Sequence, residues 1–329
     1  MKNLTGKKAL RTILSLLSAV LMIGGVLLSC NPRETAGKDD SLKIVATIFP
    51  EYDWVMNIMG DKAKDADITL LLDNGADLHS YTLSFSDMAK ITDCDLFIYV
   101  GGESDEWVDD VLKGANNKDM IAINLLDVLG DKVKEEEIVE GMEAEEEGEE
   151  AESDEHVWLS LRNASLFCDE IADALVTLDP DNKDVYLSNL EAYKKELSDL
   201  DAEYAEAVSN ASTDTLLFAD RFPFRYLTDD YGLTYYAAFA GCSTESEASF
   251  QTVVFLAEKT DELGLRSIMT IEGANNKIAE TVRDNTASKD QKILTMNSMQ
   301  SVSSDGIASG KTYLSMMKEN LEVLKEALN

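Results

Sequence analysis

The sequence predicts an α/β protein built from two Rossmann-like lobes with mainly parallel sheets, joined by one long connecting helix. Short apolar runs alternate with helix-like segments in residues 42–124, and the same alternation returns in residues 216–328. Between them lies a stretch of about 25 residues without Pro or Gly. Alternation of this kind is typical of β-α-β units and parallel sheets. The 329 residues suffice for two such units.

The first lobe is expected over residues 42–183. Its expected strands cover residues 42–48, 68–72, 96–100 and 120–124, and its expected helices cover residues 51–59, 84–91, 107–112 and 159–178. Asp179-Pro180 ends the last of these helices, because the residue before proline is disfavoured in helical geometry.

An acidic loop is expected at residues 135–155. This block holds 13 Asp or Glu residues and no Lys or Arg. Like charges at this density repel one another, so the block is predicted to be a solvated loop that cannot pack. It could gather cations weakly, but ordering a loop on binding costs conformational entropy, which favours a merely solvated loop.

The connecting helix is predicted over residues 184–209. Six apolar or aromatic residues there repeat at alternating spacings of four and three, which places them on one face of a helix. They are Tyr186, Leu190, Tyr193, Leu197, Leu200 and Tyr204. About 25 residues would span roughly 38 Å. The helix either covers one lobe or acts as a rigid strut between two lobes.

The second lobe is expected over residues 210–329. Its expected strands cover residues 216–219, 234–239, 267–271 and 293–296, and its expected helices cover residues 224–230, 250–263, 277–285 and 313–328. No short-period sequence repeat relates the two lobes.

The first 29 residues are predicted to be a secretory signal. They carry four basic residues and no acidic one, followed by an apolar run. Leu27-Leu-Ser-Cys30 resembles the lipobox of bacterial lipoproteins, which implies cleavage before Cys30 and lipidation of its sulfur. Residues 30–41 are polar and are expected to form a flexible tether. The alternative is an uncleaved transmembrane helix near the lower length limit.

Composition excludes several classes of protein. The net charge of −34 argues against nucleic-acid binding, which needs a basic surface, and against collecting anionic substrates. Two His and four Cys are too few for a structural zinc module. After cleavage Cys94, Cys168 and Cys242 remain. They are interpreted as buried thiols with at most one disulfide.

Both histidines lie in predicted loops. His79 follows the expected strand 68–72, and His156 precedes the expected helix 159–178. Loops at the carboxyl ends of parallel strands face the ligand crevice. A single loop histidine is more often structural than a metal ligand, but each of these two has acidic neighbours, which modestly favours a metal site.

Several segments together resemble the metal-binding lipoproteins that serve ABC importers for zinc or manganese, over nearly all of residues 41–329. The family's two histidine loops, G-x-D-P-H-x-Y and D-P-H-x-W-L, are matched at the histidine, with Leu78 and Glu155 in place of the prolines. The matching segments are Ile44-Val-Ala-Thr-Ile-Phe-Pro50 with Tyr52 and Trp54, Asn74-Gly-Ala-Asp-Leu-His-Ser-Tyr81, Asp154-Glu-His-Val-Trp-Leu-Ser160, and Asn320-Leu-Glu-Val-Leu-Lys-Glu-Ala-Leu328.

The resemblance implies one buried metal between two lobes, with His79 and His156 as ligands from the first lobe. It also implies an ABC transporter permease as partner, a lipid anchor on the extracytoplasmic face of the cell membrane, and no catalysis. We expect a monomer. The long helix is expected to limit hinge opening, so metal release would involve a modest shift of a lobe or loop.

The second lobe departs from the family pattern. Phe224-Arg-Tyr226 and Tyr231-Gly-Leu233 match, but the family's third ligand, a His or Glu, is Arg221 here. Arginine stays protonated and cannot bind a metal. Its neighbour Asp220 is the candidate replacement, although it could instead pair with Arg221 or Arg225.

The position of the family's fourth ligand also carries a different residue in this chain. Asn297, in Thr295-Met-Asn-Ser298, replaces the Asp of manganese-type members, and an amide oxygen carries no charge. Glu272 resembles a recurring family Glu near the metal, and could alternatively cap a helix. His79, His156, Asp220 and Glu272 together would neutralise a divalent cation.

The expected function is therefore capture of a divalent metal as cargo, with Zn²⁺ favoured and Mn²⁺ possible, for delivery to a permease. A metal-dependent hydrolase is the first alternative, but H-E-x-x-H, Walker and Gly-x-Ser-x-Gly motifs are absent from the sequence. A surface adhesin lipoprotein without a transport role is the second.

Overall fold

The computed structural model describes residues 41–143, 152–243, 247–273 and 275–329. The predicted signal segment, Cys30 and all but the last residue of the tether lie outside the described residues. Within the described ranges, no helix combines the length and apolar character needed to cross a membrane.

The first sheet is parallel and has the order β2-β1-β3-β4. The strand β3 is buried throughout, as expected for a central strand covered on both faces. The strands are β1 (Lys43–Ala46), β2 (Asp67–Leu70), β3 (Leu96–Tyr99) and β4 (Ile121–Asn124). The helices are α2 (Phe49–Met59), α3 (Phe85–Asp93), α4 (Val108–Lys113), α5 (Leu125–Leu129) and α6 (Leu161–Leu178).

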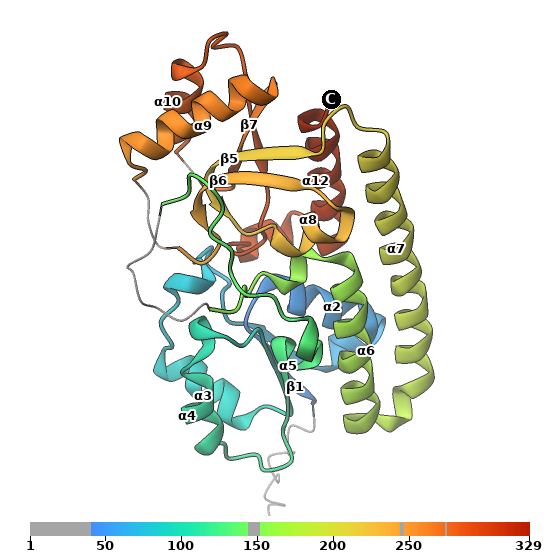
Figure 1. The fold of residues 1–329 in the computed structure, drawn as a ribbon. Helices are drawn as coiled ribbons and strands as arrows, with labels where there is room; N and C mark the ends of the chain where they lie inside the picture. Colours follow the sequence, from blue (N-terminus) through green and yellow to red (C-terminus); the bar gives the residue numbers. More distant parts are fainter. Residues whose placement is uncertain (1–40, 144–151, 244–246, 274) are drawn as a thin grey trace, which may run out of the picture. The chain divides into compact units, whose positions relative to one another are not determined.

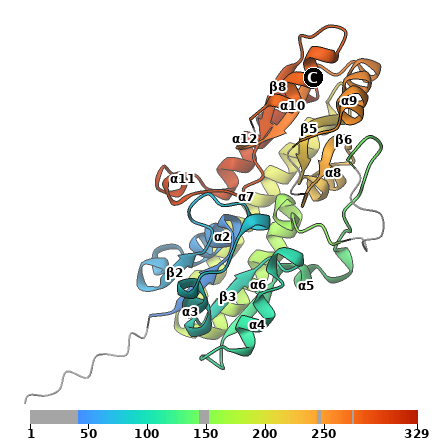
Figure 2. The ribbon, with the colours of Figure 1, turned by 90° about the vertical axis from the view of Figure 1, so that its left-hand side faces the viewer.

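The second sheet is also parallel and has the order β6-β5-β7-β8, which repeats the topology of the first (Figures 1 and 2). Its strands are β5 (Thr215–Phe222), β6 (Thr234–Ala240), β7 (Ser267–Ile271) and β8 (Lys292–Met296). Its helices are α8 (Arg225–Tyr231), α9 (Phe250–Leu263), α10 (Lys277–Asn285), α11 (Ser304–Ala308) and α12 (Tyr313–Ala327). The two-lobe α/β prediction is confirmed.

Short 3-10 helices complete the described elements. They are η1 (Gly60–Asp65), η2 (Leu78–Ser80), η3 (Glu103–Asp105), η4 (Gly130–Lys132), η5 (Val157–Leu159) and η6 (Pro180–Asn182). The sequence did not predict these turns, nor the five-residue helices α5 and α11, because such short elements show no full period of apolar residues.

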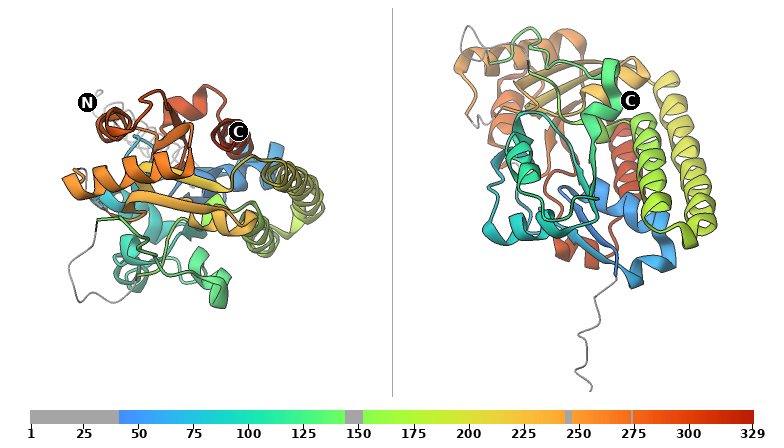
Figure 3. Two further views of the ribbon diagram at one scale, coloured as in Figure 1. Left: turned by 45° about the horizontal axis from the view of Figure 1, so that its top comes forward. Right: turned by 90° about the horizontal axis from the view of Figure 1, so that it is seen from below.

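The long helix is α7 (Lys183–Ser209), of 27 residues, or about 40 Å. Its buried residues are the six of the predicted stripe. It contacts both lobes: Asn189 donates to the Ile58 carbonyl in the first, 3.0 Å away, and Tyr204 donates to the Met317 carbonyl in the second, 2.6 Å away. Figure 3 shows α7 running beside α6 and α12. The strut interpretation is correct.

One continuous apolar core runs through both lobes, and a smaller one lies between the second sheet and helices α9 and α10. Trp158 illustrates the shared core. Its indole Nε1 donates to the Ser298 carbonyl at 2.8 Å, and the Trp158 backbone carbonyl accepts from the Tyr313 hydroxyl at 2.7 Å. Both partners belong to the second lobe. A shared core opposes large hinge opening, since opening would expose apolar surface.

The prediction that the acidic block cannot pack is wrong for its two ends. Glu136 donates its backbone N–H to the Glu152 carbonyl, and Asp154 donates to Lys134, so the ends form a short antiparallel pairing. Met142 is buried, and the backbone N–H of Glu143 donates to the Ala238 carbonyl in β6. Backbone pairing and one apolar side chain thus hold the ends in place. Residues 144–151 lie outside the described residues.

A pH-dependent stability is expected from Asp53, on α2. Its Oδ2 accepts from the Tyr313 backbone N–H at 3.1 Å, which joins α2 to the start of α12. Burial raises its pKa to about 6, against the opposing effect of hydrogen bonds from Tyr313, Tyr193 and Asn57. Between pH 4 and 6 the folded protein therefore binds more protons than the unfolded chain, so the stability supplied by this group falls as pH rises through that window.

Asp53→Asn keeps an oxygen acceptor and removes the buried charge. We expect it to raise the free energy of unfolding at pH 7 by up to about 3 kcal/mol, and to change it little at pH 4. Urea denaturation of both proteins at the two pH values measures this, with exposed Asp61→Asn as the control. An equal effect of Asp53→Asn at both pH values would contradict the expectation.

Candidate metal centre

The two histidines, 77 positions apart in sequence, meet in the structure. The Nε2 atoms of His79 and His156 are 3.2 Å apart, and their ring centroids are 5.2 Å apart. His156 is fully buried and His79 half-buried. Two imidazole nitrogens bound at 2.0–2.1 Å to one tetrahedral zinc would lie about 3.3 Å apart. The spacing of the two nitrogens therefore suits one shared ion.

Local structure fixes the backbone of both histidine loops. Asp77 Oδ1 accepts from the His79 backbone N–H at 3.1 Å, capping η2, and buried Leu78 anchors the turn. In the second loop, Asp154 Oδ1 accepts from the His156 backbone N–H at 2.9 Å. Carboxylates that accept from the N–H two residues ahead are typical of tight loops. Both loops therefore keep their shape without the family's prolines.

Outer hydrogen bonds set the tautomer of each ring. His79 Nδ1 lies 2.9 Å from the Ser104 hydroxyl, and His156 Nδ1 lies 3.0 Å from Asp154 Oδ1. The Gln300 amide nitrogen is 2.9 Å from His79 Nε2 and 2.8 Å from His156 Nε2. An amide nitrogen only donates, so both Nε2 atoms accept, and each proton sits on Nδ1. This is the arrangement that metal-binding imidazoles use.

Gln300 occupies the point on which the two lone pairs converge. Its N–H groups present positive partial charge to both rings, as a cation would. Its Oε1 lies 3.0 Å from the Ser298 hydroxyl, which in turn donates to Glu272 Oε1 at 2.6 Å. A cation entering between the rings must displace this amide.

The pKa values of the two rings shift in opposite directions. Burial lowers the pKa of His79 to about 3, assisted by the neighbouring His156 and by Arg221, and opposed by Asp77. Burial also acts to lower the pKa of His156, but the charge of Asp154 and its hydrogen bond outweigh burial, so this pKa is raised. His79 is therefore a neutral donor over the physiological range.

A third metal-binding side chain lies beside the histidines. His79, His156 and Cys242 each offer a ligand atom, and these three atoms lie within 4.8 Å of one another. Among the described residues this is the one group of three or more His, Cys, Asp or Glu side chains at such spacing. Cys242 follows β6 and is half-buried, so the interpretation of all three cysteines as buried holds only for Cys94 and Cys168. All three are free thiols.

Buried carboxylates surround the histidine pair. Glu155 is 2 % exposed, and its Oε1 accepts from the Ser104 backbone N–H at 2.8 Å. Its Oε2 accepts no hydrogen bond in the described structure and lies 3.5 Å from His79 Nδ1. Leaving a buried carboxylate oxygen unpaired is costly, and nearby positive charge would offset that cost. The site therefore suits a cation.

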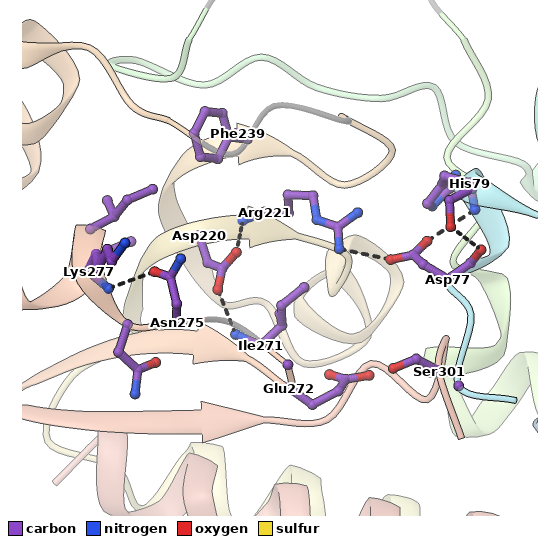
Figure 4. Close-up of a pocket in the computed structure, with 16 residues that line it drawn as sticks. Asp77, His79, Asp220, Arg221, Phe239, Ile271, Glu272, Asn275, Lys277 and Ser301 are labelled. Atoms are coloured by element: carbon purple, nitrogen blue, oxygen red, sulfur yellow. Dashed lines mark hydrogen bonds and ion pairs between the residues drawn. The ribbon is translucent and has the colours of Figure 1, made fainter. Parts of the chain in front are cut away.

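Asp220 and Glu272 lie on the wall of an adjoining cavity of about 470 Å³, which His79 and Arg221 also line (Figure 4). Asp220 lies near the carboxyl end of β5. Its carboxylate accepts from the backbone N–H groups of Arg221 at 2.9 Å and Ile271 at 3.1 Å. Glu272 directly follows β7. The structure does not bring either carboxylate into the group of His79, His156 and Cys242, and their role as metal ligands stays a prediction.

The alternative role of Asp220 is supported only in part. The Arg221 guanidinium donates to Asp77 at 2.8 Å and that of Arg225 to Glu137, but the charge of Arg221 still acts to lower the pKa of Asp220, which burial raises. The alternative role of Glu272 is wrong. Glu272 accepts from the backbone N–H of Ser298 at 2.7 Å and from its hydroxyl, instead of capping a helix.

Sequence reasoning missed Gln300, Cys242 and Glu155. Glu155 lies in the second histidine motif, where the sequence analysis treated it only as the residue that replaces the family's proline. Cys242 follows a glycine directly after a strand, at the edge where ligands gather in parallel sheets, and this signal could have found it. Gln300 has no comparable signal, because one amide in a polar segment carries no pattern.

Comparison with known proteins identifies the family. The family described as "Zinc-uptake complex component A periplasmic" (ZnuA) matches residues 44–327. The chain belongs to this family. The two-lobe fold and the long connecting helix of this ZnuA-family chain match those of its solved relatives.

Among its relatives is the zinc-binding lipoprotein AdcA of Streptococcus pneumoniae, 31% identical over 309 residues that cover 91% of this chain and 58% of AdcA. The chain thus spans little more than half the length of that relative. The high-affinity zinc uptake system protein ZnuA of Bacillus subtilis is 29% identical and is covered to 93% of its length. The solved Zn(II)-bound ZnuA-like domain of S. pneumoniae AdcA has a TM-score of 0.69 at 30% identity, covering 88% of this chain and 99% of that domain.

Proposed function

We propose that this protein is an extracytoplasmic solute-binding lipoprotein that captures a divalent transition metal, with zinc favoured, and delivers it to an ABC transporter permease. The observation that carries the proposal is the convergence of two imidazole Nε2 atoms, 3.2 Å apart, at a largely buried point. The relatives' names, a zinc-binding lipoprotein and a zinc uptake protein, support zinc as the cargo.

The chemistry of the donors agrees with this cargo. Imidazole nitrogen suits zinc, copper, iron and nickel, whereas manganese prefers carboxylate, carbonyl and water oxygen. The carboxylates of Asp154 and Glu155 lie behind the rings and supply compensating charge. We infer a site in which His79 and His156 bind the ion, with Asp220 and Glu272 as additional candidates across the adjoining cavity.

Capture then requires only local movement. His79 and His156 come from the first lobe and Gln300 from the second, so the ion would sit between lobes. Withdrawal of one amide exposes both lone pairs, while α7 and the shared core keep the lobes together. The lipid anchor at Cys30 would hold this receptor at the membrane next to its permease, and the relative named a lipoprotein supports that placement.

Replacing Gln300 by Glu tests the proposal directly. The substitution changes a neutral donor, aimed between the two imidazoles, into a carboxylate that attracts a cation. We expect zinc affinity to rise by about tenfold or more, equivalent to about 1.4 kcal/mol. Competition with a chromophoric chelator measures the change. Gln251→Glu, on the exposed face of α9, adds the same charge away from the site and should leave affinity unchanged. Equal affinity of Gln300→Glu and Gln251→Glu would count against the proposal.

A further inference from the structure

We propose that the thiolate of Cys242 is the third metal ligand, making this a His-His-Cys site. This inference rests on the proposed function and assigns the contribution of the second lobe to the loop after β6. The third-ligand position suggested by the sequence, at the end of β5, holds Arg221, which is paired with Asp77.

The geometry needs little adjustment. A tetrahedral zinc with bonds of about 2.0–2.1 Å to nitrogen and 2.3 Å to sulfur places each nitrogen about 3.6 Å from the sulfur. The three ligand atoms now lie within 4.8 Å of one another. From the upper limit of this spacing, the sulfur would have to approach the imidazoles by about 1 Å.

Gly241 lets Cys242 come this close. A Cβ on Gly241 would lie 2.9 Å from His156 Cε1, 3.0 Å from His156 Nδ1 and 3.0 Å from the Phe222 carbonyl oxygen. Only glycine leaves room for the ring at this approach. The Cys242 backbone N–H donates to Glu136 Oε1 at 2.7 Å, which fixes the turn from the other side. The Gly-Cys turn is thus held against the ring of His156.

The charge balance also favours a thiolate. Two neutral imidazoles leave a divalent ion with its full charge, and a buried uncompensated charge is costly. On binding, the Cys242 S–H bond breaks, its proton leaves to solvent, and the sulfur's electron pair forms the bond to the metal. The thiolate would place one negative charge in direct contact with the ion, whereas the carboxylates of Asp154 and Glu155 lie beyond the imidazoles and act from a greater distance.

The proposal has a consequence for metal choice. A thiolate is a soft ligand that favours zinc over manganese, so Cys242 would act as a specificity determinant. Replacing sulfur by a hydroxyl should weaken zinc binding while leaving the weaker manganese binding nearly unchanged.

Cobalt spectroscopy tests the proposal. Co²⁺ added to the metal-free chain should produce a thiolate-to-cobalt charge-transfer band in the near ultraviolet. Cys242→Ser should abolish the band and weaken zinc binding by about 10- to 100-fold or more. Cys94→Ser is the matched control, because the Cys94 sulfur donates to the Ile91 carbonyl, 3.1 Å away, and a hydroxyl can do the same. It should keep both the band and the affinity.

A second measurement needs no variant, in case Cys242→Ser fails to fold. Zinc should protect Cys242 of the unaltered chain from alkylation, as mapped by mass spectrometry. Tight zinc binding that depends on His79 and His156, without the band and without protection of Cys242, would overturn the His-His-Cys site and leave the proposed function standing. Absence of tight zinc binding by the unaltered chain would overturn both.

Discussion

His156→Ala is expected to abolish tight zinc binding, with a loss of affinity above about 100-fold. Changes in the groups that merely orient a metal-binding histidine cost 10–100-fold, and loss of the ligand itself should cost more. The variant also removes the His156 Nδ1 atom, which lies 3.0 Å from Asp154 Oδ1, and so leaves this buried carboxylate without that partner. Isothermal titration of the metal-free protein with zinc, or competition with a chelator at higher affinity, measures the effect.

The control for this prediction is Asn57→Ala, which removes a half-buried polar group on α2 that donates to Asp53. It should bind zinc as the unaltered chain does. Thermal unfolding of both variants in chelator separates loss of a ligand from loss of the fold. Near-normal zinc affinity in folded His156→Ala would show that the histidine pair is not the metal centre.

Trp158→Ala should produce the largest loss of stability, about 3–5 kcal/mol in the free energy of unfolding. The side chain is fully buried, so truncation leaves a cavity in the core that both lobes share. The change also removes the donor to the Ser298 carbonyl and leaves that carbonyl without this bond. The Trp158 ring centroid lies 5.3 Å from that of His156, so zinc affinity should fall as well.

Urea denaturation in chelator measures this loss without a contribution from bound metal. Trp158→Phe, which keeps most of the volume but not the N–H, should lie between the unaltered protein and Trp158→Ala. Phe85→Ala removes an aromatic ring that is 91% exposed and should change the free energy by less than about 0.5 kcal/mol. Equal effects of Trp158→Ala and Phe85→Ala would contradict the role given to the shared core.

Long periodic segments of this fold could be predicted from the sequence. The apolar stripe of α7 repeats over six residues, so both its length and its buried face were predictable. The common strand order of the two sheets could not be predicted from the sequence. No sequence repeat relates the two lobes, and similar topologies do not require similar sequences. The ends of the acidic block were mispredicted because backbone pairing and buried Met142 outweigh local charge there.

The candidate site was predictable only where residue type and position agree. His79 and His156 stand in loops with neighbouring carboxylates, and the structure brings their rings together. The contribution of the second lobe was harder to predict, because the position of a ligand along the sequence does not say which way its side chain turns. Asp220 is engaged by two backbone N–H groups, whereas Cys242 lies within reach of the imidazoles.

The central claim is that one divalent ion lies between the two imidazoles. A crystal structure of the zinc-loaded chain, with anomalous data on both sides of the zinc absorption edge, tests it most directly. We predict a single strong anomalous peak about 2.0–2.1 Å from Nε2 of both His79 and His156, with the Gln300 amide nitrogen displaced. A peak confined to the acidic residues 135–143, or to the cavity between Asp220 and Glu272 without either imidazole bound, would contradict the account.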